Sequence, residues 1–311
     1  MVIAVIGAGS IGRRHAANLE SLGERTDLIG WRGFDEIAFE KRGDIEAVVI
    51  ATSTPIRLEL IEMCAAQGWP FYAEKPLAWR VAQAEAIHAA GAAVADRSMV
   101  GFMMRYHPAM RDLVERDLSG IYGFSFEIGH DVRQWRENWS FAGSYAAEPE
   151  GGGVLLDLCH EIDMAMALFP DLNLKSCDAV GHAAFPGVDF SSRLSLASGS
   201  GTIGSVAVDY VAPVSVRRAA LRGTDAIIDL DFLGPEMRIA DGTGETHMPY
   251  TFERNDMFMD AMRDFLASVR GQNGSGNPLL PRFDRMRASS LMIANAWETR
   301  VFSGVVDMDM T

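Results

Sequence analysis

The chain has 311 residues, of which 48% are hydrophobic and 23% charged, and its formal net charge is −14. A chain of this length more often forms two domains than one, and its acidity argues against nucleic acid or an anionic membrane as a partner. The three cysteines form no C-x-x-C pair and no signal-peptide pattern precedes the first strand, so we expect a cytoplasmic protein without a disulfide framework or a metal site.

The chain begins with a buried-strand pattern that runs into a glycine-rich turn. Val2–Gly12 reads VIAVIGAGSIG, with Gly7, Gly9 and Gly12 in G-x-G-x-x-G spacing. Gly7 permits the tight turn, Gly9 lets a pyrophosphate approach the backbone, and Gly12 lets the next helix pack on the strand. The helix expected over Arg13–Leu22 points its N-terminus at the phosphates. We predict a dinucleotide site on Gly7, Gly9, Ser10, Ile11 and Gly12.

Strand and helix patterns alternate up to residue 119. We expect strands at Thr26–Trp31, Ala47–Thr52, Phe71–Glu74 and Met99–Phe102, and helices at Asp35–Lys41, Pro55–Gln67, Arg80–Ala90 and Pro108–Asp117. This alternation predicts an α/β fold in which residues 1–119 form a doubly wound, parallel Rossmann sheet that binds NAD(P).

The pattern changes after Gly120, where residues 120–311 are expected to form an α+β substrate-binding and oligomerisation domain. A long strand is expected at Ile121–Asp131, β-patterns with Gly-rich tips between Ser176 and Pro249, and helices at Val154–Phe169, Phe252–Val269 and Asp284–Phe302. This predicts a mainly antiparallel, open-faced sheet. Since the helices do not suffice to cover it, we expect a homodimer or homotetramer through this sheet.

The end of the second strand indicates which cofactor binds. It reads Ile29-Gly30-Trp31-Arg32, without the acidic residue that binds the ribose 2′-OH of NAD. Arg32 is placed to meet a 2′-phosphate, and Trp31 or Arg32 can stack on adenine. We therefore predict NADP as the preferred cofactor. The alternative is NAD, with Asp35 or Glu36 binding the ribose.

A lysine follows the fourth expected strand, in the sequence Tyr72-Ala73-Glu74-Lys75-Pro76. Ligands of open α/β sheets bind at the carboxyl ends of the strands, so Lys75 is directed at the site. Its ammonium group can hydrogen-bond a reacting oxygen and stabilise developing negative charge. We place Thr52, Thr54, Glu74 and Lys75 in the cofactor site.

A third motif, GGGVLLDLCHEID, spans Gly151–Asp163. On one helix, Asp157 and His160 are three residues apart and share a face, as do His160 and Asp163. Histidine is a natural acid or base for interconversion of an alcohol and a carbonyl. The alternative is that His160 is a structural residue bonded to Asp157 or Asp163.

These motifs resemble the glucose–fructose oxidoreductase/inositol dehydrogenase (Gfo/Idh/MocA) family along nearly the whole chain. The resemblance rests on the glycine turn, ATSTP at Ala51–Pro55, AEKP at Ala73–Pro76, GFMMRYHP at Gly101–Pro108 and the Gly151–Asp163 motif. It implies a Rossmann domain, an open-sheet second domain, dimers or tetramers, and hydride transfer between NAD(P) and a sugar or polyol carbon. By position, it implies Lys75 as the catalytic lysine, His160 as the acid/base and Asp157 as a residue that holds the substrate hydroxyl and the histidine.

The chain departs from the family pattern at three positions. Asp157 and His160 are three residues apart where four is common, Met103 stands where many members have Asn, and Arg57 stands where many have His. The compact D-L-x-H-E-I-D version resembles members associated with bacterial surface carbohydrates.

Further substrate contacts are expected from Arg105, His107, Arg133, Trp135 and Arg136, beside Asp157 and His160; the alternative for the loop arginines is a solvated surface role. The sequence thus predicts an NAD(P)-dependent oxidoreductase acting on a hydroxyl or carbonyl carbon of a sugar or sugar derivative. The alternatives are a non-catalytic, NAD(P)-responsive regulatory protein and a reductase or dehydrogenase of a non-sugar cyclic substrate.

Overall fold

The computed structural model describes residues 1–135 and 140–310, and the chain divides into two compact units. The first comprises Met1–His107 and Phe252–Ser290, and the second Pro108–Thr251 and Leu291–Thr311. The sequence patterns predict a single boundary after residue 119. The units are instead discontinuous, because residues 252–290 return to the first unit and pack there.

The first unit is built on a parallel sheet with the strand order β2-β1-β3-β4-β5. Its strands are β1 (Val2–Ile6), β2 (Thr26–Ile29), β3 (Ile45–Ile50), β4 (Phe71–Ala73) and β5 (Met99–Val100). β1 is buried throughout and β3 nearly so, as expected of strands covered on both faces.

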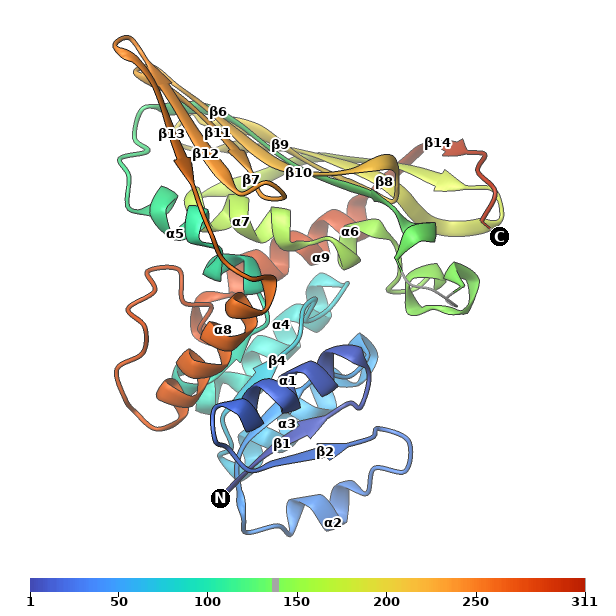
Figure 1. The fold of residues 1–311 in the computed structure, drawn as a ribbon. Helices are drawn as coiled ribbons and strands as arrows, with labels where there is room; N and C mark the ends of the chain where they lie inside the picture. The colour runs from blue at the N-terminus through green and yellow to red at the C-terminus, as the bar shows by residue number, and fades with distance from the viewer. Residues whose placement is uncertain (136–139, 311) are drawn as a thin grey trace. The chain divides into compact units, whose positions relative to one another are not determined.

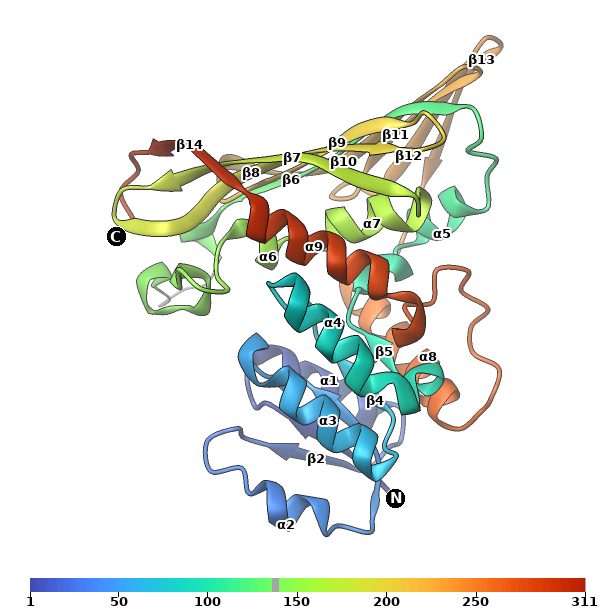
Figure 2. The same cartoon turned by 180° about the vertical axis from the view of Figure 1, so that it is seen from behind.

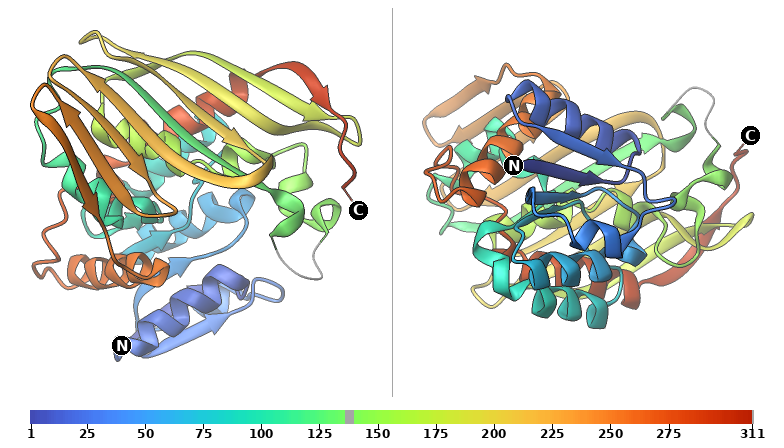
Figure 3. Two further views of the ribbon diagram at one scale, coloured as in Figure 1. Left: turned by 45° about the horizontal axis from the view of Figure 1, so that its top comes forward. Right: turned by 90° about the horizontal axis from the view of Figure 1, so that it is seen from below.

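Helices cover both faces of this sheet. They are α1 (Ser10–Ser21), α2 (Glu36–Glu40), α3 (Arg57–Gln67), α4 (Val81–Ala90) and α8 (Arg254–Val269), with short 3-10 turns η1 (Thr54–Ile56), η2 (Gly91–Arg97), η3 (Met103–Tyr106) and η7 (Phe283–Arg285). α1 packs with α8, and α3 packs with α4 on the opposite face (Figures 1 and 3). The predicted doubly wound Rossmann sheet is confirmed.

The second unit is built on a mixed sheet with the order β13-β12-β11-β10-β6-β9-β8-β7-β14. Its strands are β6 (Ile121–Asp131), β7 (Leu172–His182), β8 (Phe185–Ser198), β9 (Ile203–Asp209), β10 (Val211–Gly223), β11 (Ala226–Asp231), β12 (Glu236–Asp241), β13 (Gly244–Pro249) and β14 (Val301–Val306). β6 pairs with β9 and β7 with β14 in parallel, and the other neighbours pair antiparallel. The predicted mainly antiparallel sheet is confirmed.

The helices of the second unit lie on one face of the mixed sheet (Figures 1 and 2). They are α5 (Pro108–Val114), α6 (Val154–Asp157), α7 (His160–Leu168) and the part of α9 (Arg287–Thr299) from Leu291 onward, with 3-10 turns η4 (Val132–Gln134), η5 (Phe141–Gly143) and η6 (Tyr145–Ala147). Side chains such as Phe126, Leu194 and Leu221 are buried on that face. In the described part of this unit, no helix covers the opposite face. We call it the bare face.

Two predicted helices are wrong in extent. The expected helix Val154–Phe169 is broken, since α6 ends at Asp157 and α7 starts at His160. Asp157 and His160 therefore do not share the face of one helix. The last helix is predicted to reach Phe302 but ends at Thr299, because Val301–Val306 forms a strand that pairs with β7. None of the described helices is long and apolar enough to cross a membrane.

Candidate active site

The glycine turn between β1 and α1 has the shape that a dinucleotide site needs. Gly7 has φ +113°, a left-handed conformation that side chains disfavour. A Cβ on Gly12 would lie 1.7 Å from the carbonyl oxygen of Gly7, so only glycine lets the helix approach the strand. Around a Cβ on Gly9, by contrast, no described heavy atom lies within 4 Å. This open space lies where a phosphate would approach the backbone.

The N-terminus of α1 is also available to an anion. Gly9 precedes the helix and provides no side-chain cap, and no acidic residue stands in the first turn. Amides of a first turn lack partners within the helix and carry the positive end of its dipole. Ser10 and Ile11 are in that turn and are exposed and half-buried, respectively. The residues present therefore fit a pyrophosphate group.

The other predicted cofactor residues follow β3 and β4, at the same carboxyl edge of the sheet. Thr52 comes just after β3 and is buried, and its hydroxyl has no hydrogen-bond partner among the described residues. Thr54 begins η1. Glu74 and Lys75 come directly after β4. Because these strands are parallel, the structure brings these residues to the edge that carries the glycine turn.

The structure separates the candidates for the ribose end. Arg32 is exposed just after β2. Trp31 stacks on Phe34, with ring centroids 5.3 Å apart. Asp35 is the N-cap of α2 and accepts the backbone N–H of Ala38 at 3.0 Å. The nearby acid is thus engaged in capping, whereas Arg32 is presented at the surface.

Sequence reasoning missed a contact beneath Lys75. His15, on α1, is fully buried, and its Nε2 lies 2.7 Å from Glu74 Oε1. Burial tends to raise the pKa of Glu74, but the bond to His15 and the charges of Lys75 and Arg57 outweigh it, and the pKa is lowered. The spacing of 59 residues leaves no local signal for this pair.

In the second unit, the triple glycine forms a tightly wound turn before α6. Gly153 has φ +95°, and a Cβ there would lie 2.0 Å from Asp189 Oδ1. Asp189 is fully buried on β8, and its Oδ2 accepts the backbone N–H of Leu155 at 3.0 Å. The indole N–H of Trp297 donates to the carbonyl of Gly152 at 3.2 Å. These contacts fix where α6 begins and ends, and so fix the position of Asp157, its last residue.

Asp157 lies between two tyrosines. The Tyr145 hydroxyl donates to Asp157 Oδ1 at 2.6 Å, and the Tyr210 hydroxyl lies 3.0 Å from Asp157 Oδ2. Burial, followed by the charge of Asp157, raises the pKa of Tyr210, so Tyr210 stays protonated as a donor. His160 is 9% exposed at the start of α7, and Asp163 is buried one turn further on.

An aromatic group adjoins Asp157. The ring of Trp135 stacks on His130 with centroids 5.0 Å apart, and Tyr210 packs edge-on against Trp135 at 5.4 Å. Burial is the main cause that lowers the pKa of His130. This histidine is therefore predominantly neutral at pH 7, and it packs with Trp135 and the fully buried Tyr210 in one aromatic cluster.

A buried ion pair, which sequence reasoning also missed, anchors α7 to the mixed sheet. Glu161 is fully buried, and its Oε1 accepts from Arg217 Nε of β10 at 2.7 Å. Glu161 follows His160 directly in the sequence, so this bond fixes the first turn of α7. The available signal in the sequence was Glu161 itself, a charged residue in a largely apolar helix.

The remaining predicted substrate residues are dispersed. Arg105 is buried and donates to Leu279 O and Ser289 Oγ at 3.4 Å each, and His107 is buried with its ring edge-on to Phe252 at 4.7 Å. These contacts tie both residues into the core of the first unit. Arg133 pairs with Asp131 at 2.7 Å. Arg136 lies outside the described residues.

The chain is similar in sequence to known proteins. No family model matches it. A trans-1,2-dihydrobenzene-1,2-diol dehydrogenase of Xenopus tropicalis is 26% identical over 217 residues, or 67% of this chain and 62% of that enzyme. Its Xenopus laevis counterpart is 25% identical over 203 residues, or 63% and 58%. The match thus covers less than two thirds of the length of either enzyme.

Solved structures match nearly the whole chain. UDP-N-acetylglucosamine 3-dehydrogenase GnnA from Acidithiobacillus ferrooxidans has a TM-score of 0.75 at 18% identity, covering 96% of this chain and 95% of that one. Levoglucosan dehydrogenase, in complex with NADH and levoglucosan, has 0.76 at 19%, covering 96% of both. KijD10, a 3-ketoreductase from Actinomadura kijaniata in complex with NADP and TDP-benzene, has 0.76 at 17%, covering 98% and 99%.

These structures are sugar oxidoreductases of the Gfo/Idh/MocA type. At such identities the likeness shows the fold. It confirms the architecture that the sequence motifs implied, a Rossmann sheet combined with a mixed-sheet domain.

Proposed function

We propose that the protein is an NAD(P)-dependent oxidoreductase that acts on a hydroxyl or carbonyl carbon of a sugar or sugar derivative. The observation that carries this proposal is the uncapped start of α1 beside the open space at Gly9, at the same sheet edge as Lys75. The activities of the relatives named above agree with it. NADP is the preferred cofactor, since Arg32 is exposed after β2 while Asp35 caps α2.

The nicotinamide supplies a hydride acceptor or donor when bound. The Lys75 ammonium hydrogen-bonds the reacting oxygen and stabilises its developing negative charge. His160 takes the hydroxyl proton or returns it. Asp157 accepts hydrogen bonds from the Tyr145 and Tyr210 hydroxyls at 2.6 and 3.0 Å, which holds its carboxylate in place to bind the substrate hydroxyl.

Turnover should be measured with NADP and NAD against levoglucosan, UDP-N-acetylglucosamine and trans-1,2-dihydrobenzene-1,2-diol. With the substrate found, we expect Lys75→Ala to lower kcat by about 10²–10⁴-fold, while the Kd for NADPH changes little. Lys175→Ala, at an exposed position of β7, is the matched control. Unchanged turnover in Lys75→Ala would contradict the assignment.

A non-sugar cyclic diol is the second candidate substrate. The stacked, half-buried rings of His130 and Trp135 favour it, and the curated relatives are dihydrodiol dehydrogenases. The ratio of kcat/KM for trans-1,2-dihydrobenzene-1,2-diol and levoglucosan decides between the two. Tight NADPH binding with no turnover on any substrate would instead favour a regulatory protein.

The bare face supports a proposed homodimer or homotetramer. Ser176, Ser195, Ser205 and Ser125 align in register across β7, β8, β9 and β6, and Ala220 continues the row on β10. Small side chains leave this row flat, so that a second sheet can approach it. Beside it lies a hollow of about 780 Å³.

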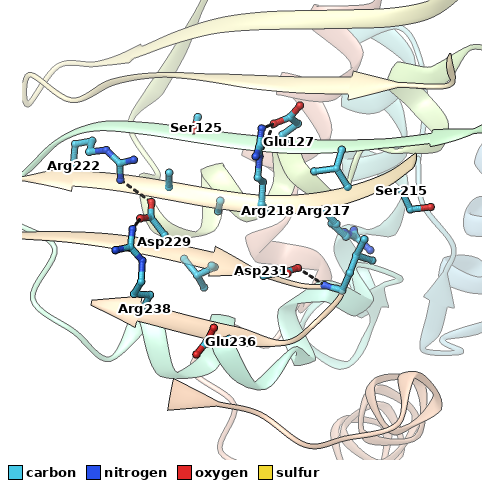
Figure 4. Close-up of a pocket in the computed structure, with 15 residues that line it drawn as sticks. Ser125, Glu127, Ser215, Arg217, Arg218, Arg222, Asp229, Asp231, Glu236 and Arg238 are labelled. Carbon is cyan, nitrogen blue, oxygen red and sulfur yellow. Dashed lines mark hydrogen bonds and ion pairs between the residues drawn. The ribbon is translucent and has the colours of Figure 1, made fainter. Parts of the chain in front are cut away.

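Arginines and acids alternate in this hollow (Figure 4). Arg218 pairs with Glu127 at 2.7 Å, Arg222 pairs with Asp229 at 2.8 Å, and Asp229 also pairs with Arg238. Mixed charges of this kind can meet the same face of a second copy.

The three cysteines are free and buried, which agrees with the proposed cytoplasmic location.

A further inference from the structure

Buried ionisable side chains hold the backbone of Lys75. Glu74 is 7% exposed, and its Oε2 accepts the backbone N–H of Lys75 at 3.3 Å. Arg57 is 4% exposed, and its Nη2 lies 3.5 Å from the Lys75 carbonyl oxygen and 3.0 Å from that of Thr52. The direction of the Lys75 side chain therefore depends on how firmly these groups, and Glu74 in particular, are held.

Glu74 is in turn held by His15. The His15 ring sits between two aromatic side chains, packing edge-on against Tyr72 at 5.1 Å and Phe258 at 6.1 Å. Gly101 leaves room for the carboxylate, because a Cβ there would lie 2.9 Å from Glu74 Oε2. The 2.7 Å contact between His15 Nε2 and Glu74 Oε1 is thus formed in a closed, low-dielectric setting.

The charge state of the pair follows from its surroundings. Although burial raises the pKa of Glu74, the His15 bond and the neighbouring cations lower it overall. Glu74 is therefore a carboxylate at neutral pH and can only accept, so His15 Nε2 carries the hydrogen. Removing the His15 donor leaves the buried Glu74 carboxylate without this hydrogen bond, which destabilises the folded protein.

We propose that His15 is a positioning residue for Lys75, acting through Glu74. The proposal rests on the proposed function, in which the Lys75 ammonium touches the reacting oxygen. His15 stands on α1, whose first turn would receive the cofactor's pyrophosphate. The His15–Glu74 bond therefore keeps the helix that receives the phosphates in register with the strand end that carries the ammonium group.

The activity test compares two variants at one position. In His15→Leu no donor reaches Glu74, and we expect kcat to fall about 10- to 100-fold, because small misplacements of a reacting group are that costly. KM and the Kd for NADPH should change by less than about threefold, since the glycine turn is intact. His15→Gln can donate its amide N–H to Glu74 and should restore most of kcat. A Gln variant as impaired as the Leu variant would contradict a role through this bond.

A second measurement is independent of turnover. In the protein without cofactor, the backbone amide of Lys75 should exchange its hydrogen faster in His15→Leu than in the wild type, and at the wild-type rate in His15→Gln. If the wild type neither binds NADPH nor turns over any substrate, the proposed function fails, and the exchange rates still decide the role of His15. Unchanged exchange in His15→Leu overturns the proposal.

Two controls guard against a general loss of stability. His182→Leu removes another buried histidine, whose Nε2 lies 2.7 Å from Met308 O in the second unit, and should leave kcat unchanged. If His15→Leu does not fold, the double variant His15→Leu/Glu74→Gln removes the buried charge as well. Its kcat should equal that of Glu74→Gln alone, because both changes break one contact. A further, additive loss in the double variant contradicts the proposal.

Discussion

Two buried carboxyl groups have pKa shifts of opposite direction because of their partners. Burial raises the pKa of both Glu74 and Asp189. The bond from His15 and the nearby cations reverse this for Glu74, whose pKa is lowered. Arg300 and the hydrogen bonds to Asp189 do not reverse it, and the pKa of Asp189 stays raised. Glu74 accepts the backbone N–H of Lys75, and Asp189 accepts that of Leu155 in the turn before α6.

His88 predicts how stability depends on pH. It stacks on Phe283 at 4.5 Å, and burial, followed by the charge of Arg287, lowers its pKa from 6.5 to about 4. Between these values the unfolded chain binds a proton that the folded protein does not, so the free energy of unfolding falls as the pH falls. One proton changes the free energy of unfolding by at most about 1.4 kcal/mol per pH unit. Because solvent screens the charge, we expect a total loss of about 1–2 kcal/mol over the whole window between the two pKa values.

The variant His88→Phe keeps the ring contact and removes the titration. Between about pH 7 and about pH 4.5, this variant should therefore lose less stability than the wild type, as measured by urea unfolding. His247 provides a contrast, because bonds to Glu236 and Glu245 raise its pKa. The protonated form of His247 stabilises the folded protein at acid pH. His247→Phe should therefore lose more stability than the wild type as the pH falls, which is opposite to the effect of His88→Phe. An equal loss of the free energy of unfolding on acidification in the wild type and in His88→Phe would contradict the prediction.

Which site residues could be predicted from the sequence depends on whether their partners are local. The glycine turn, Lys75 and the His160 segment are visible because each motif is contiguous. His15 pairs with a residue 59 positions away, and Arg217 pairs with Glu161 across 56 positions. Such contacts depend on the packing of α1 against the parallel sheet and of α7 against the mixed sheet, which no local pattern encodes.

Among the elements, the one expected as the helix Val154–Phe169 shows the limit of periodicity. Its apolar pattern is helical on both sides of residues 158–159, so sequence reasoning joined α6 and α7. The break accompanies contacts that a local pattern does not show, since α6 ends at Asp157 and the carboxylate of Asp157 accepts from Tyr145 and Tyr210. β14 was similarly missed, because its strand partner β7 begins more than a hundred residues earlier. Strands with contiguous β-pattern and glycine tips were placed well.

The glycine turn before α6 gives a prediction at this scale. In Gly153→Ala, the new Cβ would lie 2.0 Å from Asp189 Oδ1 at a φ of +95°. We expect the free energy of unfolding in urea to fall by about 3 kcal/mol, with a lower kcat as α6 shifts. Gly143→Ala is the control, since no described heavy atom lies within 4 Å of its Cβ. It should cost less than about 0.5 kcal/mol; equal losses in the two variants would contradict the prediction.

For the molecule as a whole, chain order and compact units do not coincide. The sequence suggested one boundary near residue 119, but α8 packs with α1 in the first unit. The ring of Phe265 on α8 meets Tyr72 of β4 at 5.7 Å. The unit that carries the glycine turn is therefore completed by a late segment, and a variant truncated at residue 119 would lack part of its core.

The bare face of the mixed sheet gives the last prediction, which concerns assembly. Ser205 lies in the row of small side chains, paired in register with Ser195 and Ser125. If two copies meet through this face, an arginine at that position adds a long charged side chain where the sheets approach. We expect Ser205→Arg to raise the dimer dissociation constant at least about tenfold, measured by sedimentation equilibrium.

Ser200→Arg is the matched control, because Ser200 is exposed between β8 and β9, outside the strands. It introduces the same charge and should leave assembly unchanged. The net charge of −14 opposes any association of two copies, so added salt should strengthen the wild-type dimer through screening. A wild type that remains monomeric at high salt, or a Ser205→Arg variant that assembles like the wild type, would show that the bare face is not the interface.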